Sequence, residues 1–163
     1  MTNIFSSAPF YTKYIQQPLS SFSVAQYLEG NPKLYPFFKD AIGAIDGSHI
    51  AAAPPSSLRV ACRNRKGQLS QNCLFSCSFD MRFTYALTGW EGSASDARIW
   101  ESALGTDLRI PPGTFLLADA GFPHCQELLV PYRGVCYHLA EWGRANLRYF
   151  SLLYVYIHFP DFY

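Results

Sequence analysis

The stretch that decides the fold is AIGAIDGSHI, residues 41–50, in which a run of small apolar residues ends at Asp46. Two other apolar segments carry an aspartate at one end: GSASDARIWESAL (92–104) contains Asp96, and TFLLADAGF (114–122) contains Asp119. Hard divalent cations such as Mg²⁺ take oxygen ligands, usually one or two carboxylates together with water and substrate phosphate. Three aspartates held by three separate hydrophobic elements therefore predict a divalent-metal site.

The chain has 163 residues, which is enough for one domain with a substantial core. Its 49% hydrophobic content indicates a globular protein rather than a disordered one. The net charge of +1 gives no bulk attraction to nucleic acid, so any such evidence must be local. One local cluster exists, because four basic residues lie close together: Arg59, Arg63, Arg65 and Lys66.

The five cysteines show no CxxC spacing, which favours reduced thiols in an intracellular protein. No basic segment followed by an apolar one opens the chain, so no secretory signal is expected. The longest apolar stretch, near residues 152–159, is far shorter than the roughly 20 residues of a membrane helix.

The order of elements predicts an α/β protein with a mixed sheet covered by helices. We expect an irregular N-terminal extension (1–36) with short helices, one domain (37–148) and an aromatic tail (149–163). Within the domain the pattern first predicts a buried strand over 41–45, a polar basic connection and a hairpin that turns near 80–82. A helix that begins near Ser95 or Asp96 follows, then a strand before Asp119 and one more strand after 126.

Each aspartate also has a purely structural interpretation. Asp46 and Gly47 form a typical two-residue hairpin turn between apolar runs. Asp96 has the residue type that caps a helix N-terminus, and Asp119 has the type that closes a turn after a strand. Taken singly, each aspartate fits its structural interpretation somewhat better than the functional one.

Several blocks of the chain together resemble the DDE superfamily endonucleases of the Harbinger transposase type. The blocks follow one order from residue 11 to residue 148: IGAIDGSHIAA, RNRKGQLSQN, FDMRFTYALTGWEGSASDARIW, LADAGFP and LLVPYRGVCYHLAEWGRANLR. The resemblance implies an RNase H-like fold and a metal-dependent endonuclease acting on DNA. In that family, aspartates matching Asp46, Asp96 and Asp119 are the catalytic residues that bind the metal.

The same resemblance implies Mg²⁺ or Mn²⁺ as cofactor and DNA as partner, together with a nuclear location and a Myb-like or other DNA-binding partner protein. Two metal ions can activate water and neutralise charge on both the attacking and the leaving oxygen. With the resemblance in hand, we expect Arg63, Arg65 and Lys66 to contact phosphates. His49 could position substrate or water, and its alternative is a structural role.

The chain departs from the family pattern in two places. Ser95 stands where the family usually has His. The family's final glutamate follows a block like NLRHA, whereas here the sequence after Arg148 becomes YFSLLYVYIHFPDFY, so neither Glu127 nor Glu141 takes that role. This switch predicts a truncated or mis-spliced product with an incomplete C-terminal end of the fold.

Two other functions compete with the nuclease. A haloacid-dehalogenase-type phosphatase needs a nucleophilic aspartate two residues before Asp46, and Ala44 in that position excludes covalent phosphoryl chemistry. The second is a catalytically inactive transposase remnant that binds DNA or a protein partner, and this alternative stays open.

Overall fold

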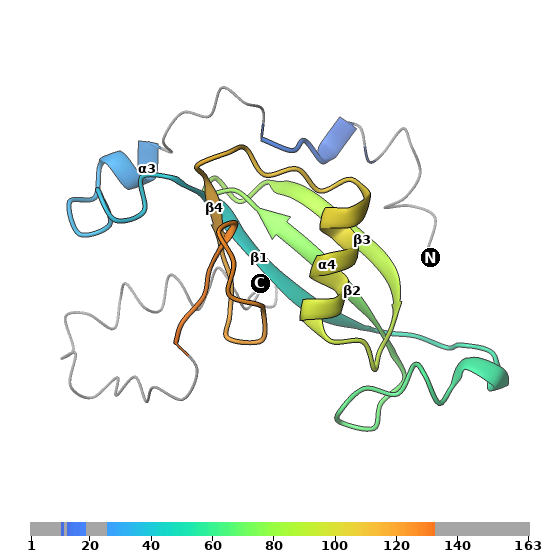
Figure 1. Cartoon of the computed structure of the whole chain (residues 1–163). Coiled ribbons are helices and arrows are strands. Elements are labelled where there is room, and N and C mark those ends of the chain that lie inside the picture. Colours follow the sequence, from blue (N-terminus) through green and yellow to red (C-terminus); the bar gives the residue numbers. More distant parts are fainter. Residues whose placement is uncertain (1–10, 12, 19–25, 133–163) are drawn as a thin grey trace, which may run out of the picture.

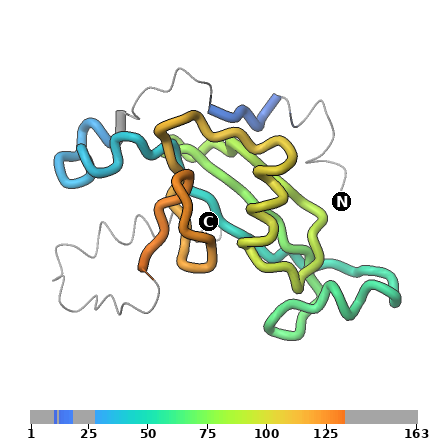
Figure 2. Tube along the Cα trace, viewed as in Figure 1, coloured from blue at the N-terminus to red at the C-terminus, as the bar shows by residue number. Residues whose placement is uncertain are grey.

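The computed structural model describes residues 11, 13–18 and 26–132 (Figures 1 and 2). Five strands and one long helix form the body of this part, preceded by a short helix and interrupted by one 3₁₀ turn. In chain order the elements are α3 (Gln26–Glu29), β1 (Ala41–Ala51), η1 (Ser56–Leu58), β2 (Ser70–Cys77), β3 (Phe83–Glu91), α4 (Asp96–Thr106), β4 (Phe115–Leu117) and β5 (Leu128–Leu129).

The strands form one mixed sheet in the order β3-β2-β1-β4-β5. β1 and β2 are antiparallel, as are β2 and β3, whereas β4 runs parallel to β1 and β5 parallel to β4. α4 follows β3 and lies over the sheet in Figure 1. This arrangement confirms the predicted α/β class and agrees with the RNase H-like fold that the resemblance implied.

Most elements lie where the sequence pattern predicts them. The hairpin turns between Cys77 and Phe83, and Met81 in the turn has a positive φ of 63°. α4 begins at Asp96 with Ser95 as its N-cap, and β4 and β5 occupy the positions expected for the last two strands.

The predicted strand over 41–45 is too short, and the hairpin turn at Asp46 and Gly47 is wrong. β1 continues through both residues to Ala51 because β2 pairs with it from Ala44 onward, opposing Asp46 with Phe75 and Gly47 with Leu74. The ladder with β2 continues on both sides of the Asp-Gly pair, and this outweighs the local preference of the pair for a turn.

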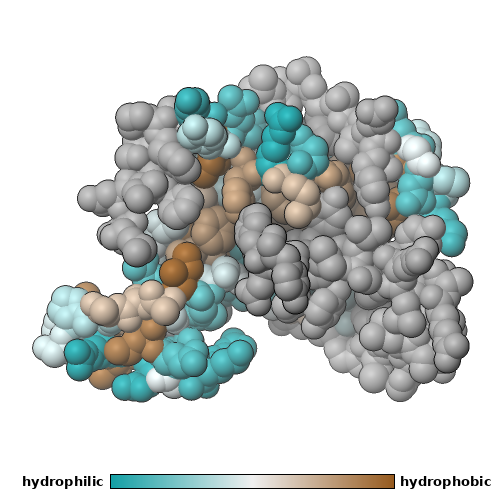
Figure 3. All heavy atoms as spheres, turned by 180° about the vertical axis from the view of Figure 1, so that it is seen from behind, coloured by the Kyte–Doolittle hydropathy of each residue, from teal (hydrophilic) through white to brown (hydrophobic). Residues whose placement is uncertain are grey.

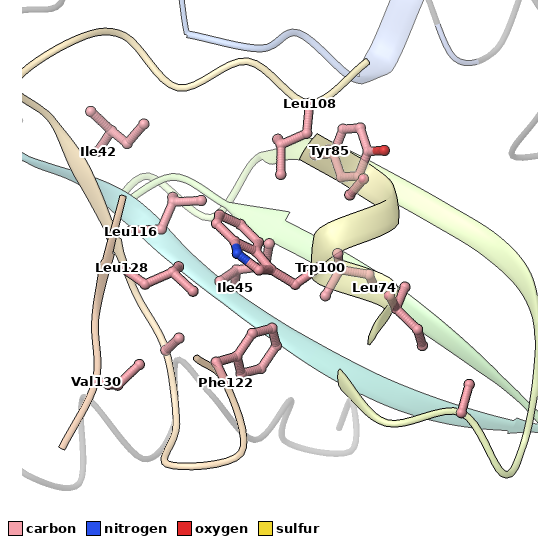
Figure 4. Packing of buried hydrophobic residues seen from close by; sticks show 14 residues of the cluster. Ile42, Ile45, Leu74, Tyr85, Trp100, Leu108, Leu116, Phe122, Leu128 and Val130 are labelled. Atoms are coloured by element: carbon pink, nitrogen blue, oxygen red, sulfur yellow. The ribbon is translucent and has the colours of Figure 1, made fainter. Parts of the chain in front are cut away.

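The main core lies between α4 and the sheet (Figure 4). The apolar stripe of α4 buries Ile99, Trp100 and Ala103 against this core, and Trp100 meets Phe122 edge-on at 6.5 Å between ring centroids. Such aromatic pairs contribute beyond their burial by about 0.5–1.5 kcal/mol. The packing fixes α4, and with it Asp96, over the strands.

The opposite face of the sheet carries a smaller buried cluster of Ala41, Ala44, Cys77 and Leu117. Side chains alternate between the two faces of a strand, so these residues point away from α4. Seen from behind, a band of apolar residues runs up the molecule from its lower left lobe (Figure 3). Among exposed large side chains, Ile50 and Phe83 belong to the strands β1 and β3.

The cysteines at 62, 73, 77 and 125 are free thiols, and Cys136 lies outside the described residues. Within the described ranges, no helix is both long and apolar enough to cross a membrane. The aromatic tail over 149–163 and the residue Glu141 also lie outside the part that the structure describes.

The buried Tyr85 makes the stability of the fold depend on alkaline pH. Its hydroxyl donates a hydrogen bond of 2.7 Å to Asp107 Oδ1, and burial, followed by this bond to a carboxylate, raises the Tyr85 pKa well above its ordinary value. The folded state therefore keeps the proton above pH 10, where an unfolded tyrosine loses it.

We predict that the free energy of unfolding falls as the pH rises beyond about 10, by up to about 1.4 kcal/mol per pH unit for this group. Tyr85→Phe should cost about 1 kcal/mol at neutral pH and should remove this part of the alkaline decline. Urea denaturation between pH 7 and 11 measures both effects. An unchanged alkaline slope in the variant would assign the decline to other groups.

Candidate metal centre

The three aspartates come from three elements that meet at one edge of β1. β4 runs parallel to β1 with Leu117 opposite Ala44, so Asp119 follows on directly beside Asp46. β4 ends at Leu117, and beyond that point this edge of β1 has no strand neighbour in the described part. The edge is therefore open where the two carboxylates lie.

Asp96 reaches the same edge because Gly47 has no side chain. A Cβ atom placed on Gly47 would collide with Asp96 Oδ1 and would lie 2.7 Å from Asp96 Cγ. Real Cβ contacts essentially never fall below 3.0 Å. The Asp96 carboxylate thus occupies the space that any other residue at position 47 would fill, next to Asp46.

Asn72 holds Asp96 in this position from the neighbouring strand β2. Its side-chain amide donates hydrogen bonds of 3.0 Å to Asp96 Oδ1 and 3.1 Å to the carbonyl oxygen of Ala94. Asn72 is only 1% exposed, and its Oδ1 atom has no hydrogen-bond partner among the described residues. Both N–H groups of this buried amide donate to acceptors at the start of α4, and this fixes the direction of the Asp96 side chain.

A second glycine keeps space between Asp96 and Asp119. A Cβ atom on Gly121 would lie 2.9 Å from Asp119 Oδ1 and 3.6 Å from Asp96 Oδ2. The two carboxylates therefore face one small volume. The Gly121 N–H also donates a hydrogen bond of 2.8 Å to Asp119 Oδ1, so the structural interpretation of Asp119 as a turn residue is confirmed.

The pKa of Asp46 is raised by its position in this arrangement. Burial raises the pKa of Asp46 to about 7, and the carboxylates of Asp119 and Asp96 add a smaller increase. The hydrogen bond of 2.8 Å from the Gly47 N–H acts in the opposite direction and lowers this pKa. Within the described ranges, no Lys or Arg pairs with the three aspartates, and the ion pair present joins Arg82 to Asp80. Among the residues that the structure describes, no cationic side chain pairs with the negative charge at this edge.

These residues fit a hydrated divalent cation. Within the described residues, no group of three or more His, Cys, Asp or Glu side chains lies so that it could hold a metal ion. Mg²⁺ does not require one, because it keeps several waters and takes one or two carboxylates. Oxygen donors, the repulsion between the carboxylates and the space beside Gly121, which both Asp96 and Asp119 border, suit such an ion.

Ser95 explains how the chain accommodates its departure from the family pattern. Its Oγ atom accepts the backbone N–H of Arg98 at 3.4 Å and so caps α4. The cap is therefore Ser95 and not Asp96, and the structural interpretation of Asp96 as the N-cap is wrong. With the cap supplied by its neighbour, Asp96 can direct its carboxylate to Asn72 and the edge of β1.

The other predicted site residues lie further along β1 or in the connection that follows it. His49 is exposed on β1, and its Nδ1 atom lies 3.1 Å from Ser70 Oγ. Arg63, Arg65 and Lys66 are exposed in the connection between β1 and β2, where Arg63 donates a hydrogen bond of 2.6 Å to the Gly67 carbonyl. The structure brings none of the four into contact with the aspartates.

Comparison with known proteins agrees with this geometry. Residues 45–149 match the family of DDE superfamily endonucleases, and the chain belongs to this family. Over 93 residues it is 34% identical to a protein of Rattus norvegicus named "Putative nuclease HARBI1", a stretch that covers 55% of this chain and 27% of the relative. No solved structure matches the chain significantly.

Proposed function

We propose that this chain is a nuclease-type domain derived from a Harbinger-type transposase, and that it cleaves DNA strands with a divalent cation. Asp46, Asp96 and Asp119 are the proposed catalytic and metal-binding residues. The observation that carries the proposal is the position of Asp96, whose carboxylate fills the side-chain space of Gly47 and faces Asp119 across Gly121. A structural aspartate at a helix start has no need of such an approach to two glycines.

A bound Mg²⁺ or Mn²⁺ would activate water and neutralise charge on the phosphate that is cut. The chain's own residues set the geometry: Asn72 aims Asp96, the open end of β4 exposes Asp46, and the Gly121 N–H orients Asp119. Gly47 leaves room for the Asp96 carboxylate, and Gly121 keeps a side chain out of the space between Asp96 and Asp119.

DNA is the proposed partner. The exposed Arg63, Arg65 and Lys66 would bind backbone phosphates at a distance from the cleavage edge, which contributes affinity without reading sequence. A nuclear location, a Myb-like or other DNA-binding partner protein and the division into 1–36, 37–148 and 149–163 belong to the same proposal. A supporting role for His49 is the weakest element, because its ring contacts Ser70.

A second candidate function is an inactive transposase remnant that binds DNA or a protein without cutting. It is favoured by the finding that no group of three or more metal-binding side chains within the described residues lies so that it could hold a metal ion. Catalysis needs ligands held close to their final geometry, whereas DNA binding through phosphates does not.

Nicking of supercoiled plasmid separates the two functions. We expect the chain to convert plasmid to the open circular form with Mg²⁺ or Mn²⁺ and to lose this activity in EDTA. Asp46→Ala should be inactive in both conditions. If the chain does not exceed Asp46→Ala with either metal but still retards DNA in a gel, the inactive remnant is the correct function.

A further inference from the structure

Arg98 occupies a position that helix electrostatics disfavour. It lies in the first turn of α4, where the helix dipole favours negative charge and repels a cation. Its side chain is exposed, and within the described part of the chain no carboxylate forms an ion pair with it. The structure shows a different partner: the guanidinium lies over the ring of Trp90, 5.6 Å from its centroid.

Trp90 belongs to a row of residues that leads directly to the three aspartates. It pairs with Asn72 across β2 and β3, and Asn72 pairs with His49 across β1 and β2. Paired residues point to the same face of a sheet, and Asn72 bonds Asp96 on the face that α4 covers. Asp96 and Arg98 therefore lie over neighbouring parts of one row.

The spacing of the strands gives the distance between Arg98 and the aspartates across the sheet. Neighbouring strands are about 4.8 Å apart, so a group above β3 lies about 10 Å across the sheet from β1. One strand of duplex DNA rises about 3.4 Å per nucleotide and also winds around the axis, so neighbouring phosphates are about 7 Å apart and about 10 Å corresponds to roughly one to two nucleotides. A DNA strand bound at the aspartates can thus present another phosphate to Arg98.

We propose that Arg98, held over the ring of Trp90, binds a backbone phosphate of the DNA strand one or two nucleotides from the bond that the aspartate site would cut. The inference rests on the proposed function, since it uses that site to place the strand. A guanidinium held over an aromatic ring by cation–π attraction still has N–H donors that can form the paired hydrogen bonds that phosphates accept. Trp90 acts as the positioning residue and Arg98 as the binding residue.

Binding measured without catalysis tests this role. A fluorescein-labelled 20-base-pair duplex is titrated with the full chain in EDTA, and the affinity is followed by anisotropy over a series of NaCl concentrations. We expect Arg98→Gln to weaken binding roughly tenfold at low salt. The slope of log affinity against log salt should fall by about 0.9, as expected for one lost phosphate contact.

Three further variants show whether position or charge alone matters. Arg82→Gln removes an exposed arginine at the hairpin turn, where Asp80 already pairs with it, and should leave the slope unchanged. Trp90→Leu should give about half the loss of affinity of Arg98→Gln while keeping every charge. Arg98→Lys should restore the slope but not the full affinity, because an ammonium group cannot stack in the same plane.

The outcomes separate this inference from the proposed function. If Arg98→Gln matches Arg82→Gln in slope and affinity, Arg98 binds no phosphate, and the nuclease can still be correct. If Arg98→Gln loses its contact but the plasmid is not nicked, the phosphate site stands and the nuclease fails. If the chain binds no duplex at low salt, both proposals are wrong.

Discussion

Gly47→Ala is expected to reduce metal-dependent DNA cleavage by about 100-fold or more while changing the thermal stability little. The added Cβ atom would enter the space of the Asp96 carboxylate, and the carboxylate is the end of a side chain that can turn away. Turning away costs the bond from Asn72, about 1 kcal/mol. Catalysis loses far more, because a displacement of about 1 Å in a reacting group can cost about 100-fold in rate.

Gly105→Ala is the matched control for this variant. Gly105 lies in α4, and no atom lies within 4 Å of a Cβ placed there. Alanine should therefore leave cleavage unchanged and should stabilise the helix by about 0.5–1 kcal/mol. Rates from plasmid nicking and melting curves from circular dichroism complete the comparison. Normal cleavage by Gly47→Ala would show that Asp96 has no part in the reaction.

Asp46→Asn is expected to stabilise the metal-free protein and to abolish its response to metal. At pH 8 in EDTA the Asp46 carboxylate is ionised, half-buried and close to two other carboxylates, an arrangement that burial and repulsion both disfavour. A neutral amide of the same shape relieves both. We expect a gain of about 1 kcal/mol, or roughly 2–4 °C in melting temperature.

With Mn²⁺ added, the wild type should have a higher melting temperature than Asp46→Asn, the reverse of the order in EDTA. The wild type should gain melting temperature with Mn²⁺ concentration, because a ligand that binds only the folded state stabilises it. The melting temperature of Asp46→Asn should rise little with Mn²⁺. Asp80→Asn removes an exposed carboxylate from the hairpin turn and should follow the wild type in both conditions. A lower melting temperature for Asp46→Asn in EDTA would contradict the picture of three mutually repelling acids.

Much of the sheet was predictable from the sequence because its signals are local. Alternating β-rich runs on either side of residues 80–82 predict the hairpin, and Ser95 before an apolar helical pattern predicts the start of α4. The apolar run before Asp119 likewise predicts β4. Each of these elements forms from residues that are close in the chain.

The length of β1 and the approach of Asp96 to Gly47 were not predictable in the same way. Asp46 and Gly47 have the local chemistry of a turn, and only the pairing with β2, whose residues come more than 20 positions later, extends the strand through them. Asn72 shows no signal in the sequence, because an asparagine in a β-rich run becomes informative only once Asp96 is placed beside it. The one hint in the sequence that another side chain approaches β1 closely was the glycine of the Asp-Gly pair that follows the buried run.

Anomalous X-ray scattering from crystals soaked in MnCl₂ tests most directly whether the three aspartates share a cation. We expect a manganese peak at the edge of β1, coordinated by carboxylate oxygens of at least two of Asp46, Asp96 and Asp119, and completed by water. The same peak should be absent from crystals of Asp46→Asn. A manganese ion bound elsewhere, with this edge empty at saturating metal, would contradict the account.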